Sequence, residues 1–210
     1  MAAGTAMPMP GASRRSATSI SRIAGFLLLG CLAASVGAQD RAAGQRKHGY
    51  CASCHGLDGQ SFKPHYPILA GQSESYLLEQ LAQFKDGRRH DPSMNTVASQ
   101  LSLQDMGDLA AFLASVKPHP GRLRPDPSKA ARGKARAARA GCSACHPRNS
   151  KSAPNSFPRI AGQKHAYLAK QLRDFRDGRR IDATGTMRPV AQSLTDVEID
   201  ELSDFFAGMR

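Results

Sequence analysis

The chain has 210 residues and carries 29 Lys and Arg residues against 17 Asp and Glu, which gives a formal net charge of +12. With 40% hydrophobic and 22% charged residues, the composition is that of a globular protein and excludes an intrinsically disordered one. The length leaves room for an export signal followed by two small domains.

Residues 1–38 have the parts of an export signal. Arg14, Arg15 and Arg22 lead into an apolar stretch at 23–36, and the small residues Val-Gly-Ala at 36–38 form a cleavage site. The apolar stretch is too short and too rich in Gly and Ala for a membrane span. We therefore expect a soluble mature protein in the periplasm.

Two other interpretations of this segment stay open. Cys31 follows Leu-Leu-Gly and resembles a lipoprotein box, which would tether the protein to a membrane, but the residues after Cys31 stay apolar instead of turning polar. Peripheral association with a membrane is a weaker form of this alternative. Arg14-Arg15 resembles a twin-arginine signal, but the bulky apolar residue expected just after the pair is missing. A general secretory signal fits better.

The pattern C-x-x-C-H occurs twice, at Cys51–His55 and at Cys142–His146. At this spacing two thiols can attach to the vinyl groups of one haem while the following histidine binds its iron. A single C-x-x-C could instead be a redox dithiol or half of a zinc site, but two copies with His directly after favour c-type haem. No cysteine is left for a structural disulfide, because Cys31 lies in the signal and the others are Cys51, Cys54, Cys142 and Cys145. We expect two covalently bound c-type haems in a protein that transfers electrons.

The chain after residue 38 is an internal duplication. PILAGQ at 67–72 recurs as PRIAGQ at 158–163, and FKDGRR at 84–89 recurs as FRDGRR at 175–180. The offset is 91 residues up to Arg89 and 93 at Met94 and Met187, so the second copy has two extra residues before its methionine. Self-similarity of this length predicts two equivalent folded units.

The domain boundaries follow from the repeat and from a proline-rich seam. We expect a signal peptide at 1–38, a first domain at 39–117, a linker at 118–127 and a second domain at 128–210. Residues 39–117 have no net charge, whereas residues 118–210 carry a net charge of +9. An uneven field of this size orients a molecule as it approaches a charged partner. We expect the basic half to dock on the acidic surface of a redox protein.

Each repeat has helical periodicity and no alternating strand pattern, which predicts an all-α fold. A first helix is expected at 74–86 and a last helix at 103–116, where Ser102 and Asp105 have capping-box spacing. Thr195 and Glu198 have the same spacing before the last helix of the second repeat. A basic helix is expected at 128–140 with Ser128 as its N-cap, packed on its domain and adding to the positive face. Nucleic-acid binding by this helix is disfavoured in an exported haem protein.

Each iron needs a sixth ligand, or an open site if the protein is an enzyme. The candidates after the two motifs are His65, His90, Met94, Met106, His165, Met187 and Met209. Only Met94 and Met187 occupy equivalent positions in the two repeats, and both lie in polar surroundings that predict a loop before the final helix. A soft thioether is a suitable sixth ligand, and His/Met coordination raises the reduction potential. A filled sixth position also argues against chemistry on a bound substrate.

Two further pairs of matched residues have open roles. His55 and His146 should each donate the free ring N–H to a carbonyl, and Pro67 and Pro158 are candidates to position that acceptor or are plain turn prolines. The arginine pairs near the methionines either neutralise haem propionates or are solvated charge; they are Arg88, Arg89, Arg179 and Arg180.

These features, each present twice, resemble class I c-type cytochromes, and as a tandem pair they resemble the dihaem cytochrome c4 family. The match covers nearly all of residues 40–210 and rests on C-x-x-C-H, P-x-x-A-G-Q, the helix ending in F-x-D-G-R-R, and Met before a final amphipathic helix. The resemblance implies two tandem cytochrome c domains in a periplasmic carrier that passes electrons to terminal oxidases or other respiratory acceptors. It also implies covalent attachment at the four motif cysteines, with axial pairs His55/Met94 and His146/Met187. Pro147 follows His146, where the family often has glycine. Because of this difference, the resemblance does not predict the exposure and reduction potential of the second haem as well as it predicts its ligands.

Three rival functions stay open. The first is a dihaem cytochrome subunit of a larger redox enzyme, such as a flavocytochrome sulfide dehydrogenase. The second is a dihaem peroxidase, which would need an open or switchable iron. The third is a thiol–disulfide or zinc protein. We also expect the haem of the basic half to have the higher potential, because nearby positive charge favours the reduced state.

Overall fold

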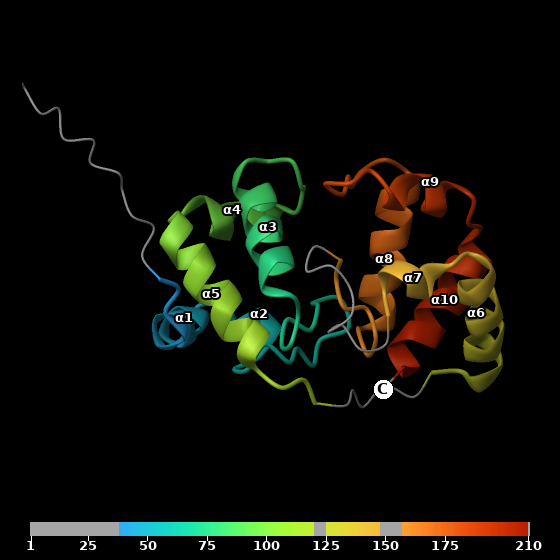
Figure 1. The fold of residues 1–210 in the computed structure, drawn as a ribbon, viewed down its shortest axis with the longest axis horizontal. Coiled ribbons are helices and arrows are strands. Elements are labelled where there is room, and N and C mark those ends of the chain that lie inside the picture. The colour runs from blue at the N-terminus through green and yellow to red at the C-terminus, as the bar shows by residue number, and fades with distance from the viewer. Residues whose placement is uncertain (1–37, 120–124, 148–156, 210) are drawn as a thin grey trace, which may run out of the picture. The chain divides into compact units, whose positions relative to one another are not determined.

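The computed structural model describes residues 38–119, 125–147 and 157–209 (Figure 1). These residues belong to one compact unit of the chain, which contains both repeats. The export signal predicted at 1–38 lies outside the described residues except for its last residue, and so does the centre of the predicted linker.

The described residues form helices and no strand, so the predicted all-α class is confirmed. The first repeat contributes α1 (Arg41–His48), α2 (Ala52–His55), α3 (Glu74–Lys85), α4 (Pro92–Ser99) and α5 (Leu103–Ser115). The second contributes α6 (Pro127–Arg139), α7 (Cys142–Cys145), α8 (His165–Arg176), α9 (Met187–Gln192) and α10 (Asp196–Gly208). Figure 1 shows the same order of helices in each repeat.

The two repeats have the same packing scheme. In the first, α5 packs against both α1 and α3, and α4 packs against α3. In the second, α10 packs against both α6 and α8, and α9 packs against α8. The last helix of each repeat is therefore the central one, as its long apolar stripe requires.

The predicted long helices are found, and the last helix of each repeat has its predicted cap. The helix expected at 74–86 spans Glu74–Lys85, and the last helices begin with complete capping boxes at Ser102 and Thr195. The prediction of Ser128 as N-cap is wrong: α6 begins two residues earlier, because the Asp126 carboxylate accepts hydrogen bonds from Ser128 N and Lys129 N, and Pro127 suits the first helical position.

The positive charge of α6 is used mainly inside its own repeat. Lys129 forms an ion pair with Asp200, Arg132 with Glu201, and Arg136 with Glu198 and Glu201, all on α10. The predicted packing role of this helix is confirmed. Its contribution to a positive docking face is smaller than its five cations suggest, because α10 neutralises three of them.

Each repeat has a small core of its own. Leu77, Ala110 and Leu113 form the first, and the second is built on Leu168, Leu194, Ile199, Leu202 and Phe206. Cores of this size are modest for units of about 80 residues, which leaves a stabilising role for a large apolar cofactor. Among the described residues, no helix is long and apolar enough to cross a membrane.

Candidate metal centres

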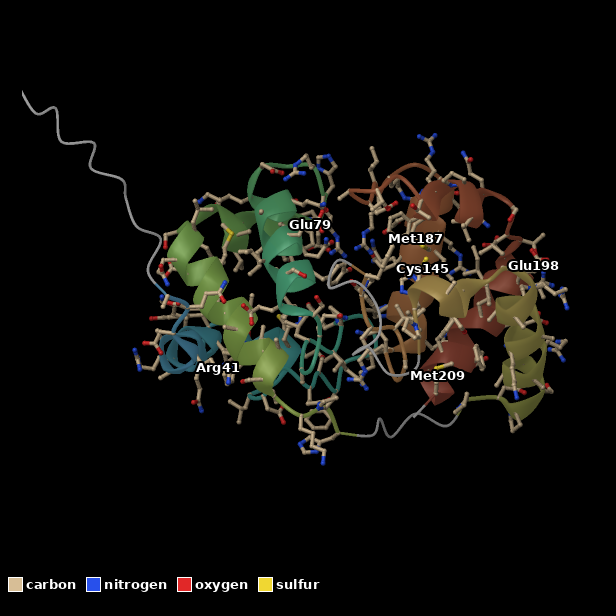
Figure 2. The ribbon with its side chains drawn as sticks, in the orientation of Figure 1. Arg41, Glu79, Cys145, Met187, Glu198 and Met209 are labelled. Atoms are coloured by element: carbon tan, nitrogen blue, oxygen red, sulfur yellow. The ribbon has the colours of Figure 1, made fainter. Side chains whose placement is uncertain are left out.

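Each C-x-x-C-H motif forms a single helical turn. His55 N donates to Cys51 O at 2.9 Å, and His146 N donates to Cys142 O at the same distance. This turn places the two cysteines of a motif on one side of the helix with the histidine directly after them. The four cysteines are partly buried and form no disulfide. Figure 2 labels Cys145 at the end of α7 and Met187 at the start of α9.

The proximal histidines are oriented by backbone carbonyls. Nδ1 of His55 lies 3.2 Å from Pro67 O, and Nδ1 of His146 lies 2.9 Å from Pro158 O. Of the two roles left open for these prolines, the structure therefore supports that of positioning the acceptor. Because Nδ1–H is held by the carbonyl, Nε2 of each ring is left for a metal.

Burial favours the neutral form of both imidazoles. His55 is 7% exposed and His146 8%, and this burial lowers the pKa of each ring although the proline carbonyl acts in the opposite direction. A neutral imidazole has a lone pair for a metal, whereas an imidazolium does not.

The thiols do not resemble those of a redox dithiol. Burial raises the pKa of Cys51 and of Cys142, the first cysteine of each motif. Dithiol oxidoreductases need the opposite shift, because the thiolate is the reacting species. The electrostatics therefore disfavour the thiol–disulfide alternative.

The methionines lie in short helices, so the predicted loops are wrong. Met94 is in α4, and Met187 is the first residue of α9. An aspartate holds the start of each turn: Asp91 accepts from Met94 N at 3.1 Å, and Asp182 accepts from Met187 N at 3.0 Å. Sequence reasoning missed these two aspartates, although they align at the 91-residue offset of the repeat.

The rejected ligand candidates have other environments. Met106 is fully buried in α5, and Met209 packs against the core of the second repeat. His165 pairs with Asp200 at 2.9 Å, whereas His65 and His90 are exposed. None of these residues is repeated in the other half of the chain in an equivalent setting.

The arginine pairs divide into one exposed and one buried member. Arg88 pairs with Asp86, and Arg179 pairs with Asp174 and Asp177 at the surface. Arg89 and Arg180 are 8% and 7% exposed, and neither forms an ion pair with a described carboxylate. The surface alternative therefore applies to the first arginine of each pair only.

The buried arginines join the two repeats. Each donates to the side-chain oxygens of the same two glutamines and to a tyrosine hydroxyl of the other repeat. The guanidinium nitrogens of Arg89 lie 2.6 Å from the side-chain oxygen of Gln80, 3.0 Å from that of Gln171 and 3.0 Å from that of Tyr167. Those of Arg180 lie 2.6 Å from the side-chain oxygen of Gln171, 2.9 Å from that of Gln80 and 2.8 Å from that of Tyr76. These six hydrogen bonds go to four neutral side chains, so two cations are buried together without an anion from the described part of the chain.

This environment suits an anionic cofactor. Burial would raise the pKa of Tyr167, but the neighbouring Arg89 and Arg180 guanidiniums hold it below its usual value. Nε of Arg180 is buried without a hydrogen-bond partner in the described part of the chain. A carboxylate would satisfy this donor and compensate the buried charge. The residues present therefore fit a haem, which carries two propionates.

Comparisons with known proteins give the family. The sequence model of the Cytochrome c family matches residues 42–117 and again residues 130–209. Over 196 residues the chain is 39% identical to cytochrome c4 of Pseudomonas aeruginosa, a match that covers 88% of this chain and 96% of that protein. The chain belongs to the cytochrome c4 family. The two repeats are thus tandem cytochrome c domains, and the protein binds two c-type haems covalently.

Other similarities support the fold and point to a redox setting. The crystal structure of reduced recombinant cytochrome c4 from Pseudomonas stutzeri is 38% identical, with a TM-score of 0.75, covering 82% of this chain and 100% of that one. A "thiosulfate dehydrogenase electron acceptor" of Thiomonas intermedia is 33% identical over 168 residues, covering 75% of this chain and 77% of that one. Members of the cytochrome c4 family are electron-transfer proteins.

Proposed function

We propose that this cytochrome c4 homologue is a periplasmic electron carrier with two closed haem sites, passing electrons to respiratory acceptors such as terminal oxidases. The observation that carries the proposal is the matched set of one neutral histidine and one methionine in each repeat. When bound, each haem supplies a one-electron Fe(III)/Fe(II) couple. With both axial positions filled by protein, no coordination site is left for a substrate, which disfavours a peroxidase.

The chain's own residues have defined roles in this proposal. Cys51 and Cys54 anchor the first haem through thioethers, and Cys142 and Cys145 anchor the second. His55 and Met94 would hold the iron of the first haem as its axial ligands, and His146 and Met187 would hold that of the second. Pro67 O and Pro158 O fix the histidine rings, and Asp91 and Asp182 hold the turns that carry the methionines.

A second candidate concerns the electron donor. The similarity to a "thiosulfate dehydrogenase electron acceptor" favours a role as the cytochrome partner or subunit of an enzyme that oxidises a sulfur compound. This agrees with the alternative of a dihaem subunit in a larger redox enzyme. In either role the net charge of +9 on residues 118–210 supports docking on an acidic protein surface.

Export and domain limits belong to the same proposal. Residues 1–38 act as the signal peptide, with Cys31 removed in it, and 118–127 link the domains 39–117 and 128–210. Mass spectrometry of the mature protein tests this directly: an N-terminus at Gln39 is expected, and a lipidated Cys31 would show a tethered protein instead.

Stopped-flow kinetics test the carrier role. We expect the reduced protein to be oxidised rapidly in air by membranes that contain a terminal oxidase, at a rate that falls with added salt, and to react only slowly with hydrogen peroxide. Fast peroxide turnover would contradict the proposal. Preferential and rapid reduction by a thiosulfate-oxidising enzyme would favour the second candidate as donor.

A further inference from the structure

The glutamine that ends each P-x-x-A-G-Q segment contacts the other repeat. Gln72 ends the segment of the first repeat and Gln163 ends that of the second, 91 residues later. Both are buried, at 7% and 6% exposure, and the side chain of each bonds to the backbone of the other repeat. A pair of buried amides with this reciprocity needs a physical explanation, because burying an amide is costly unless it is fully hydrogen-bonded.

Gln163 holds a single residue of the first repeat by both backbone groups. Its Oε1 accepts from Ile68 N at 2.8 Å, and its Nε2 donates to Ile68 O at 2.9 Å. Ile68 directly follows Pro67, whose carbonyl holds the ring of His55. The peptide unit between Pro67 and Ile68 therefore makes both contacts: its carbonyl holds the ring of His55, and its N–H donates to Gln163 of the second repeat.

Gln72 makes the mirror-image contact. Its Oε1 accepts from Arg159 N at 2.7 Å, and its Nε2 donates to Arg159 O at 2.9 Å. Arg159 directly follows Pro158, whose carbonyl holds the ring of His146. Both nitrogen and oxygen of each amide are therefore used on the residue next to a histidine-orienting carbonyl.

We propose that Gln72 and Gln163 are positioning residues that act across the domain boundary, each fixing the proximal histidine of the other repeat's haem. The inference rests on the proposed axial role of His55 and His146. A carbonyl held in place keeps a strong hydrogen bond to Nδ1–H and makes the imidazole a more basic ligand, which favours Fe(III). Releasing the carbonyl weakens that bond and raises the potential of that haem alone. The potential of each haem is thus set partly by the opposite domain.

The decisive experiment is a redox titration of the full holoprotein with Gln72→Leu and Gln163→Leu. Each haem is followed by the NMR signal of its own axial methionine methyl group. Gln72→Leu should raise the potential of the second haem, and Gln163→Leu that of the first. We expect a change of roughly threefold in the reduced-to-oxidised ratio at fixed ambient potential, about 30 mV for a one-electron couple.

The matched control is Gln83→Leu. Gln83 is a buried amide of the first repeat whose side chain donates to Glu79 in the same helix, so this variant should leave the potential of the second haem unchanged. A second readout is the hydrogen exchange of the histidine rings. In the wild-type protein the Nδ1 protons of His55 and His146 should exchange slowly with solvent, and each should exchange at least tenfold faster in the variant of the opposite repeat.

The outcome separates this inference from the proposed function. The proposed action of Gln72 and Gln163 across the domain boundary would be overturned by any of three results. These are a change in the potential of the haem in the same repeat, equal changes in both haems, or unchanged potentials and exchange rates. The proposed function would still stand if the wild-type protein shows two His/Met haems. A wild-type protein without two such haems would overturn the proposed function itself.

Discussion

One glycine in each repeat lets the first helix approach the last. A Cβ on Gly44 would lie 2.0 Å from Asp108 O in α5, and a Cβ on Gly133 would lie 2.0 Å from Glu201 O in α10. Both contacts are with backbone atoms, which cannot move away as a flexible side chain can. The close α1–α5 and α6–α10 crossings therefore depend on the missing side chain.

Gly44→Ala and Gly133→Ala should each destabilise their own domain. Helix propensity favours alanine, but the overlap with the backbone forces the helices apart, at a net cost of about 2 kcal/mol in the free energy of unfolding. Urea unfolding followed by circular dichroism measures this. The control is Gly107→Ala, because a Cβ there meets only the Gln39 side chain at 3.3 Å. If Gly44→Ala unfolds at the wild-type midpoint, the packing explanation is wrong.

At the residue scale, the candidate functional residues that the sequence singles out are those in equivalent positions of the two repeats. Met94 and Met187 stand out because no other candidate ligand is matched in both halves, and Pro67 and Pro158 because each follows its motif at the same distance. The roles of Gln72 and Gln163 could not be predicted from their motif. Their partners lie 87 and 95 residues away, in the other repeat, and local spacing says nothing about such contacts.

At the scale of elements, the long helices were predictable and the short ones were not. α3, α5 and α10 have an apolar stripe and a capping signal, so the predicted limits of α3 and α5 and the predicted start of α10 are correct to within about a residue. α1 and α4 are only eight residues long, and α9 six, so a helical period is not visible in them. Short helices of this kind form because tertiary packing stabilises them.

The contact between α6 and α10 depends on one buried carboxylate. Glu201 is 5% exposed and pairs with both Arg132 and Arg136. Removing its charge leaves Arg132 without the carboxylate that it contacts, whereas Arg136 keeps Glu198, and the partial exposure of Arg132 limits the cost.

Glu201→Gln should therefore lower the free energy of unfolding of the second domain by about 1–2 kcal/mol. Asp196→Asn is the matched control, since Asp196 is exposed and pairs with surface arginines, and its effect on the free energy of unfolding should be clearly smaller. Thermal unfolding of both variants decides the question. Equal effects of the two substitutions would show that the burial of Glu201 adds nothing to the stability of the second domain.

At the scale of the whole molecule, the two domains share a fold but differ in charge. Residues 39–117 have no net charge and residues 118–210 carry +9, although α10 neutralises much of α6. Positive charge around an iron favours its reduced state, because reduction adds an electron to the site.

The second haem should therefore have the higher reduction potential. Titration of single-haem variants, in which both cysteines of one motif are replaced by alanine, gives the potential of each site. The difference between the sites should narrow with added salt, since exposed charges are screened. A higher potential for the first haem at low salt would contradict the charge argument.

The most direct test of two closed His/Met haem sites combines absorption spectroscopy with redox titration. The mature protein is compared with Met94→Ala and Met187→Ala, and with Met106→Leu as a control in the buried core. We expect two haems per chain, a thioether–iron band near the red end of the spectrum, and loss of about half of that band in each alanine variant, together with a lower potential for one haem. The Met106→Leu protein should keep the full band. A full band in both alanine variants, or fewer than two haems per wild-type chain, would contradict the assignment.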